Sequence, residues 1–225
     1  CEDTAGYPEG SSLRWNCEVT WEAEQLLSLH PEEAPRLSAL CREGRMDLSA
    51  AYANLLTGLM GAEQGCRLAY PARRLARELG IELHTATMTD DPSHAWWVPS
   101  VLAGSGVRYL AVGCNDCRGA FAAGNPVRPP IWWEGPDGSR VLAYFDKSSY
   151  GGPIGPHIGD LLVDCAADTG LRDFLYIYGV VDHGGGPTRA DLLTARELST
   201  WPIFPTLLHS TTDDFFTAVE TSGVE

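Results

Sequence analysis

Apolar and polar residues along the chain alternate at two spacings, one typical of helices and one typical of strands. Apolar residues three or four positions apart predict helices over 20–29, 31–42, 55–79, 95–103, 159–169, 189–198 and 215–220. Apolar runs and two-residue alternation predict strands over 13–18, 46–52, 81–88, 107–112, 174–181 and 203–208. A Gly-Pro-Asp-Gly turn at 135–138 predicts a hairpin of strands at 130–133 and 140–145.

This order of elements predicts an α/β fold in a single domain. Strands that alternate with helices are typical of parallel sheets covered by helices, and right-handed crossovers leave either a barrel or a doubly wound sheet. The pattern does not decide between these two architectures. The 225 residues show no internal repeat and no low-complexity linker, so one domain accounts for the length.

Composition excludes several classes of protein. With 44% hydrophobic residues the chain is too apolar to be disordered, and no apolar run approaches the ~18 residues that a membrane span needs. The net charge is −14 and Lys147 is the single lysine, so phosphate backbones and anionic membranes would be repelled. We therefore expect neither a nucleic-acid partner nor a membrane partner.

The seven cysteines are odd in number and scattered, which is not typical of a secreted disulfide framework. We expect reduced thiols and a cytoplasmic location instead. One close pair, Cys114 and Cys117, lacks the second pair that a zinc ribbon requires, and we interpret it as free thiols.

Polar residues gather where the predicted strands end. Active sites of barrels and doubly wound sheets lie at the carboxyl ends of parallel strands. Glycoside cleavage requires two carboxyl groups, one to attack the anomeric carbon and one to protonate the leaving oxygen. Tryptophans would suit stacking on sugars. The residues in question are Trp15, Asn16, Glu18, Asn54, Asp90, Asp91, His94, Cys114, Asn115, Asp116, Asp182 and His183, together with Trp96, Trp97, Trp132 and Trp133.

Each candidate also has a purely structural interpretation. Asp90 could cap the helix that begins near Pro92, because Asp is common at helix starts. Asp182 could orient the glycine-rich turn that follows it, and His94 and His183 could be ordinary loop residues. One tryptophan of each adjacent pair is expected in the core. The residues themselves leave these alternatives open.

Four stretches resemble the bacterial α-mannosidases of glycoside hydrolase family 38. Tyr178-Gly-Val-Val-Asp182-His-Gly-Gly-Gly-Pro-Thr188 is similar to the family's Gly-x-Gly-Asp-Gly-Gly-Gly-Gly-Pro-Thr, and Asp90-Asp-Pro-Ser-His94-Ala resembles its Asp-x-Phe-Gly-His-Ser. Trp132-Trp-Glu-Gly-Pro-Asp-Gly-Ser-Arg-Val-Leu142 and Glu43-Gly-Arg-Met-Asp-Leu48 also have counterparts in the family. The likeness follows the same order along nearly the whole chain.

The resemblance implies a zinc-dependent retaining glycosidase, with an α-mannoside as the favoured substrate, on a seven-stranded parallel β/α barrel. It implies that Asp90 is the catalytic nucleophile and a zinc ligand, and that Asp182 is the general acid/base. We expect the carbohydrate substrate to contact Trp15, Glu18, Asn54, Asp91, His94, Trp96, Trp133 and His183.

The family's first strand carries a His-x-Asp zinc-binding pair, and this sequence contains no His-x-Asp. We therefore expect residues 1–225 to form one partial catalytic domain, an incomplete barrel that lacks the first strand, the C-terminal part and most zinc ligands, and that is inactive alone. Two alternatives stay open. One is a catalytically inactive carbohydrate-binding barrel, and the other is a related β/α-barrel polysaccharide deacetylase or amylase-like enzyme.

Overall fold

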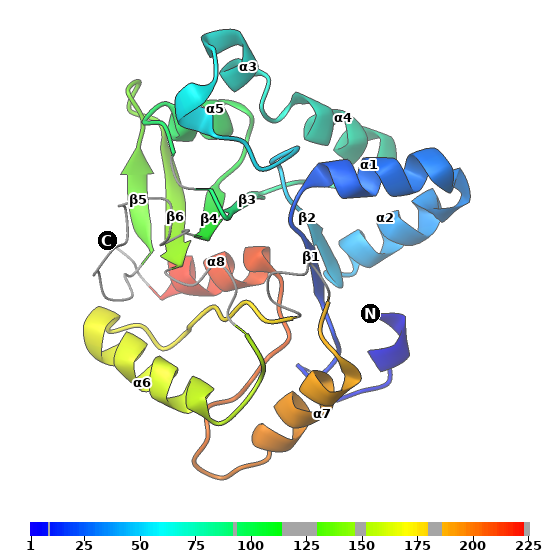
Figure 1. The fold of residues 1–225 in the computed structure, drawn as a ribbon, viewed down its shortest axis with the longest axis vertical. Coiled ribbons are helices and arrows are strands. Elements are labelled where there is room, and N and C mark those ends of the chain that lie inside the picture. The colour runs from blue at the N-terminus through cyan, green and yellow to red at the C-terminus, as the bar shows by residue number, and fades with distance from the viewer. Residues whose placement is uncertain (9, 92–93, 114–129, 147–151, 180–185, 223–225) are drawn as a thin grey trace.

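The computed structural model describes residues 1–8, 10–91, 94–113, 130–146, 152–179 and 186–222, whose strands form two sheets (Figure 1). The smaller sheet pairs β1 (Trp15–Cys17) with β2 (Met46–Leu48) in parallel. The larger sheet has the order β3 (Thr85–Thr89), β4 (Tyr109–Gly113), β6 (Arg140–Asp146) and β5 (Ile131–Glu134). Strands β3, β4 and β6 are parallel, and β5 pairs with β6 antiparallel.

The register of the larger sheet brings the carboxyl ends of three parallel strands together at one end of the sheet. Thr89 of β3 lies beside Gly113 of β4, and Gly113 lies beside Asp146 of β6. At the opposite end of the strands, Glu134, the last residue of β5, lies beside Arg140, the first residue of β6. The last residues of β3 and of β5 are therefore placed at opposite ends of this sheet.

Helices surround both sheets (Figure 1). The α-helices of the described residues are α1 (Thr20–Leu29), α2 (Ala34–Arg42), α3 (Ala62–Cys66), α4 (Tyr70–Leu79), α5 (Val98–Gly104), α6 (His157–Thr169), α7 (Arg189–Leu198) and α8 (Thr212–Thr221). Short 3₁₀ turns cover Glu2–Thr4, Pro31–Glu33 and Thr57–Leu59. The predicted helices over 20–29, 31–42, 159–169 and 189–198 are thus confirmed, and the long helix predicted over 55–79 is divided into α3 and α4.

Helix α4 shows how the sequence pattern becomes a buried face. Its buried residues, Ala72, Leu75, Ala76 and Leu79, recur at the three- and four-residue spacing of one helical stripe. Gly80 ends the helix with a left-handed backbone at φ +63°, a conformation that glycine adopts without steric cost. The buried stripe belongs to the larger hydrophobic cluster, and α4 contacts α1 and α2.

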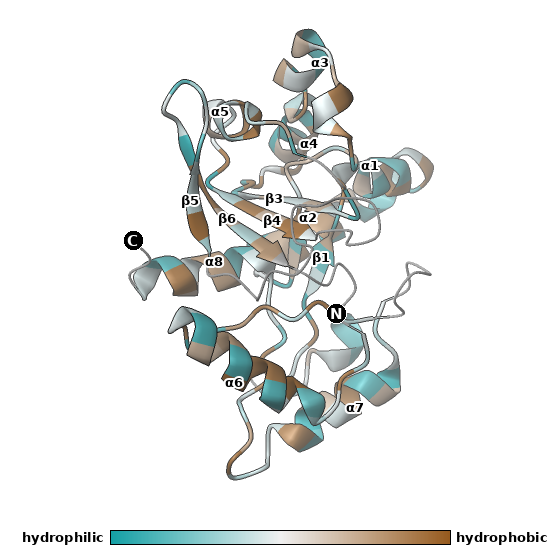
Figure 2. Ribbon diagram, turned by 60° about the vertical axis from the view of Figure 1, so that its left-hand side comes forward, coloured by the Kyte–Doolittle hydropathy of each residue, from teal (hydrophilic) through white to brown (hydrophobic). Residues whose placement is uncertain are grey.

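The larger sheet buries both faces, because successive residues of a strand point to opposite sides. Leu110 and Val112 of β4 belong to the cluster that also contains α4 and α5 residues. Tyr109 faces α8 instead, where its ring stacks on Phe216 with centroids 5.0 Å apart. Figure 2 shows apolar residues along these strands and both colours alternating around α6 and α7.

The predicted parallel β/α barrel is wrong: the described strands form two open sheets of two and four strands, and one strand is antiparallel. The two sheets are separated between β2 and β3. There, hydrogen bonds of a side chain just after β2 replace the main-chain hydrogen bonds that would pair the two strands. The Thr87 N–H donates to Ser49 Oγ at 2.8 Å, and Ser49 Oγ contacts Thr87 O at 3.3 Å. A single main-chain bond, from Ala50 N to Thr85 O at 2.8 Å, joins this segment to β3.

Two predicted strands are also wrong over the described residues. Residues 174–179 and 203–208 contain no strand, although both runs are apolar. Ile203 is 99% exposed and Leu208 is 64% exposed. The pattern marked these residues as apolar, but it carries no information on whether a neighbouring strand is available to pair with them.

The hairpin and the last helix follow the sequence expectations. Gly135 N donates to Ser139 O at 2.9 Å in the turn between β5 and β6. Helix α8 begins after Thr211, whose hydroxyl accepts from Asp214 N at 3.2 Å in a capping box. Cys1, Cys17, Cys41, Cys66 and Cys165 are free, as expected. Within the described ranges, the helices are too short or too polar for any of them to cross a bilayer.

Candidate functional site

The start of α1 and the segment after β2 are joined by main-chain hydrogen bonds. The N–H groups of Thr20 and Trp21 donate to the carbonyls of Ala51 and Tyr52 at 3.1 and 3.0 Å. The first N–H groups of a helix have no partner inside the helix, and the apolar N-cap residue Val19 cannot provide one. The segment after β2 fills that role and is thereby held beside the end of β1.

This arrangement brings Glu18 and Asn54 together, as the sequence analysis expected. Glu18 follows β1, Asn54 follows the β2 segment, and Asn54 Nδ2 donates to Glu18 Oε1 at 2.6 Å. Burial raises the pKa of Glu18, and the hydrogen bond from Asn54 opposes this shift. The charges of Glu22 and Asp90 raise the Glu18 pKa further. Glu18 and Asp90 therefore share one electrostatic environment at the ends of β1 and β3.

Asp90 follows β3 in a backbone conformation that few residues other than glycine adopt. Its φ is +55°, in the left-handed region, where Asp is one of the tolerated residue types. All five residues of β3 are buried, whereas Asp90 is exposed. Backbone in this region costs energy and persists where the surrounding packing holds it, which is typical of functional sites. The turn presents the Asp90 carboxylate at the carboxyl end of the sheet.

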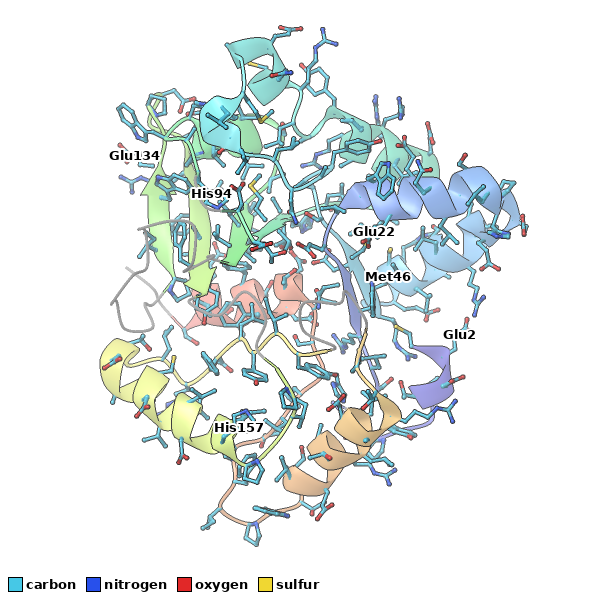
Figure 3. All side chains as sticks on the ribbon, in the orientation of Figure 1. Glu2, Glu22, Met46, His94, Glu134 and His157 are labelled. Carbon is cyan, nitrogen blue, oxygen red and sulfur yellow. The ribbon has the colours of Figure 1, made fainter. Side chains whose placement is uncertain are left out.

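Asp91 and His94 come next in the chain and are buried. Their side chains are 2% and 8% exposed, and Asp91 Oδ2 lies 3.9 Å from His94 Nδ1. Burial lowers the pKa of His94 to about 4, so the imidazole is neutral at pH 7. In Figure 3, His94 lies among the side chains beneath α5, and Glu22 lies on α1. Asp91 and His94 are thus a buried pair in the chain that follows Asp90.

The predicted tryptophans lie in three different places. The ring of Trp15 packs against Gly186, where an added Cβ would lie 2.6 Å from the ring. Trp133 is partly buried and packs on Phe145 with ring centroids 5.7 Å apart. Trp96 is 66% exposed, and its Nε1 donates to Glu134 O at 3.0 Å. Because Glu134 lies at the opposite end of the sheet from Asp90, the structure does not bring Trp96 to the Glu18–Asp90 site.

Several predicted residues lie outside the described residues. Asp182 and His183 are among them, as are Cys114, Asn115, Asp116 and Cys117. The site that the structure describes is therefore built from Glu18, Asn54 and Asp90. It contains a carboxylate that could act as a nucleophile and a carboxyl–amide pair that could bind sugar hydroxyls.

The described residues do not fit a complete zinc site. Zinc takes about four Cys, His, Asp or Glu ligands in proteins. Across residues 1–8, 10–91, 94–113, 130–146, 152–179 and 186–222, no group of three such side chains could hold a metal ion. Asp90 offers one carboxylate donor at the end of β3, and no other described ligand is grouped with it in such a set.

Asp47, a carboxylate in the middle of β2, is a functional candidate that does not stand out from the sequence pattern. Burial raises the pKa of Asp47 to about 7, and the charges of Asp213 and Asp214 add to this effect. Thr212 Oγ1 donates to Asp47 Oδ2 at 2.8 Å at the start of α8. The available signal was a carboxylate between two apolar residues of a predicted strand, since such residues are seldom buried without a partner.

Asn16, which the sequence placed among the site candidates, holds the start of α8 instead. Its Oδ1 accepts from Thr212 N at 2.8 Å, and its Nδ2 donates to Ser210 O at 3.2 Å. Together with Asp47, it supplies acceptors to the first turn of a helix whose N–H groups need them. Asn16 thus joins β1 to the C-terminal helix of the described chain.

Comparison with known proteins identifies the kind of domain to which this site belongs. Residues 19–223 match the glycosyl hydrolases family 38 N-terminal domain, and the chain belongs to that family. The resemblance noted in the sequence is thereby confirmed. A search of curated proteins found no match.

Two solved structures share the fold. An alpha-mannosidase from Enterococcus faecalis V583 has a TM-score of 0.76 and is 19% identical, over 98% of this chain and 25% of that chain. A protein in glycosyl hydrolase family 38 from Enterococcus faecalis has a TM-score of 0.65 and is 16% identical, over 98% of this chain and 24% of that chain. The chain thus spans about a quarter of the length of these proteins, and at this identity the likeness shows the fold alone.

Proposed function

We propose that the protein hydrolyses α-glycosides, with α-mannosides as the favoured substrates, by a retaining double displacement. Asp90 is the nucleophile of this proposal and Asp182 is its general acid/base. The observation that carries the proposal is Asp90 itself, an exposed carboxylate held in a left-handed turn at the carboxyl end of β3 beside Glu18. Membership of a glycoside hydrolase family supports the assignment.

The proposed reaction has two balanced steps. In the first, an Asp90 carboxylate oxygen bonds to the anomeric carbon while the bond to the leaving oxygen breaks, and that oxygen takes the proton of Asp182. In the second, Asp182 removes a proton from water, and the water oxygen displaces Asp90 from the anomeric carbon. Two inversions restore the starting configuration. Each product gains one hydroxyl, and both carboxyl groups return to their initial protonation states.

Glu18 and Asn54 are the proposed contacts for sugar hydroxyls. The Glu18 carboxylate accepts hydrogen bonds, and the Asn54 amide both donates and accepts, so the pair matches a sugar hydroxyl, which does both. Their mutual bond fixes the two groups relative to each other before a ligand arrives. The predicted contacts Trp15, Asp91, His94, Trp133 and His183 stay predictions, as does a cytoplasmic location. Trp96 is not among the proposed contacts, because its ring is bonded to Glu134 at the opposite end of the larger sheet from Asp90.

Zinc enters the proposal only as the cofactor expected from the family resemblance, with Asp90 as the ligand that this chain would contribute. Because the described residues do not fit a complete zinc site, no step of the proposed reaction is assigned to the metal.

The proposal is tested with the protein expressed from its complete coding sequence. We expect turnover of 4-nitrophenyl α-mannoside, with the α-anomer of mannose as the first product by proton NMR. We expect Asp90→Asn and Asp182→Asn each to lower kcat by roughly 100-fold or more. Asp160→Asn, at an exposed carboxylate in the first turn of α6, is the control and should retain kcat. Turnover like that of the unaltered protein in both active-site variants would contradict the assignment.

A further inference from the structure

The side chain of Ser49, the residue after β2, forms hydrogen bonds to two different chain segments. Its Oγ accepts from the backbone N–H of Thr87 in β3 at 2.8 Å and from the N–H of Ala51 at 3.1 Å. The same hydroxyl donates to the carbonyl oxygen of Thr87 at 3.3 Å. A hydroxyl group offers one donor and two acceptor sites, so Ser49 uses all three. Ser49 is 3% exposed, and these bonds are therefore made away from bulk water.

The main chain of Ser49 holds the chain on both sides of Glu18. Ser49 N donates to Cys17 O at 3.1 Å, and the hydroxyl of Thr20 donates to Ser49 O. Cys17 directly precedes Glu18, and Thr20 follows Glu18 by two residues. The backbone that carries Glu18 is thus bonded, before and after this residue, to a single residue of the neighbouring segment.

The other two segments of the site also contact Ser49 close to their functional side chains. Asn54 is the third residue after Ala51, and Asp90 is the third residue after Thr87. Ala51 and Thr87 are the two residues whose N–H groups donate to Ser49 Oγ. Ser49 therefore lies at the junction of the three segments that carry the nucleophile and the proposed sugar contacts.

The three functional residues are joined by bonds of two kinds. Glu18 and Asn54 are held by their own hydrogen bond and by main-chain bonds between their segments, and neither depends on the Ser49 side chain. The strand that leads to Asp90 is held differently. Within the described residues, one main-chain bond reaches β3 from the segment after β2, and it lies at Thr85, the first residue of the strand. The Ser49 hydroxyl supplies the contact at the third residue of β3, which is nearer to Asp90.

We infer that Ser49 is a positioning residue that sets the placement of the Asp90 nucleophile relative to the Glu18–Asn54 pair. In this role it touches neither the sugar nor the reacting atoms. The inference rests on the proposed function, because it requires that Asp90 attacks a sugar bound by that pair. A misplacement of about 1 Å can lower a rate by about 100-fold, so a hydrogen bond that fixes the strand before the nucleophile has a measurable effect on kcat.

The inference is tested with Ser49→Ala in the protein expressed from its complete coding sequence. This variant lacks Oγ but keeps the main-chain bonds to the β1 segment. We expect kcat for 4-nitrophenyl α-mannoside to fall about tenfold or more, and KM to stay within about twofold, because the Glu18–Asn54 pair keeps its own supports. Ser38→Ala is the matched control and should retain kcat. Ser38 is also buried, at 4% exposure, but its hydroxyl donates to Leu79 O at 2.6 Å, between α2 and α4.

Two further variants separate the hydrogen bonds of Ser49 from its bulk. Ser49→Thr retains the hydroxyl and should keep kcat within about twofold of the unaltered protein. Ser49→Cys retains the size of the side chain, but sulfur is a weak acceptor, so its kcat should lie between those of Ser49→Ala and the unaltered protein. Thermal unfolding shows whether each variant is folded at the assay temperature, and Ser49→Cys takes the place of Ser49→Ala if the latter does not fold. A folded Ser49→Thr with a kcat as low as that of Ser49→Ala would overturn the role of the hydroxyl.

A double-mutant comparison separates positioning of Asp90 from a general loss of folded protein. If Ser49 acts through Asp90, then Ser49→Ala should cause no further loss of the residual kcat once Asp90→Asn is present. An additive loss, an equal loss in Ser38→Ala, or an unchanged kcat in Ser49→Ala would overturn the positioning role and leave the proposed function intact. If Asp90→Asn itself turns over 4-nitrophenyl α-mannoside as the unaltered protein does, or if no α-mannoside is cleaved, the proposed function fails and this inference fails with it.

Discussion

The side-chain amide of Asn54 donates a 2.6 Å hydrogen bond to the carboxylate of Glu18, which joins the end of β1 to the segment that follows β2. This bond lowers the pKa of Glu18 against the opposing effects of burial and of the charges of Glu22 and Asp90. The charge state of Glu18 therefore depends on Asn54, and that dependence can be measured.

We predict that Asn54→Ala raises the pKa of Glu18, because the ionised carboxylate loses a donor. The acidic limb of the pH profile of kcat/KM for an aryl α-mannoside should therefore move to higher pH. Asn16→Ala is the matched control, since the amide of Asn16 bonds to Ser210 and Thr212 instead. A profile that does not move in Asn54→Ala, or that moves equally in Asn16→Ala, would show that Glu18 does not limit activity at low pH.

We predict that Asp47 makes the fold less stable as the pH rises. The carboxyl loses its proton near pH 4 in the unfolded chain and near pH 7 in the folded chain. The folded state therefore binds more protons across this window, and the free energy of unfolding falls between about pH 4 and 7. Asp47→Asn keeps an acceptor for Thr212 Oγ1 and should be more stable than the unaltered protein at pH 8, by up to about 4 kcal/mol.

The Asp47 prediction is checked by urea unfolding at pH 5 and at pH 8. Asp160→Asn, at an exposed carboxylate, serves as the control and should leave the pH dependence unchanged. An Asp47→Asn variant that is less stable at pH 8 would mean that ionised Asp47 is stabilised by its contacts with α8.

We predict that His94 makes the fold less stable as the pH falls, which is opposite to the effect of Asp47. Its pKa is about 4 in the folded chain and about 6.5 in the unfolded chain, so the unfolded state binds more protons between these values. The free energy of unfolding should therefore fall as the pH decreases from 6.5 to 4. His94→Gln should reduce the difference in stability between pH 7 and pH 4.5 by roughly 2 kcal/mol, measured by urea unfolding. His157→Gln, at an exposed histidine, should not reduce it.

We predict that Gly186→Ala destabilises the protein by about 1–3 kcal/mol, because the added Cβ would lie 2.6 Å from the ring of Trp15. Gly104→Ala is the control, since a Cβ at Gly104 meets nothing within 4 Å at the end of α5. The control variant should equal or slightly exceed the unaltered protein in thermal stability. Equal thermal stability of both variants would mean that the Trp15 ring moves aside without cost.

We predict that Trp96→Ala leaves KM for an aryl α-mannoside within about twofold, because its ring is bonded to Glu134 at the far end of the larger sheet from Asp90. Steady-state kinetics on Trp96→Ala and on Asn54→Ala provide the comparison. A large rise in KM for Trp96→Ala alone would place the bound sugar at the β5–β6 end of the domain.

Much of the helical structure could be predicted because it depends on local rules. The stripe of α4, the capping box at Thr211 and the turn at Gly135 each involve residues close in sequence. The break between the two sheets could not be predicted, because it depends on Ser49 meeting Thr87 across 38 residues. The strand predicted over 203–208 was wrong for a related reason. An apolar sequence does not reveal whether a partner strand is present, and Ile203 is exposed in the structure.

The candidate site was predictable in part. The rule that active sites lie at the carboxyl ends of parallel strands was enough to group Glu18 with Asn54. The rule could not reveal that the side chains of Asp91 and His94 are buried while Asp90 is exposed. Nor could it reveal the role of Asp47, whose partner Thr212 lies 165 residues away along the chain.

The main-chain bonds from Thr20 and Trp21 to Ala51 and Tyr52 have a consequence for sequence drift. A helix cap made by a Ser or Asp side chain disappears when that residue changes, whereas this cap is made by peptide groups that nearly every residue type carries. The side chains of all four residues can be exchanged while the geometry between Glu18 and Asn54 is kept. Substitutions at these four positions can therefore accumulate during evolution without changing the relative positions of Glu18 and Asn54.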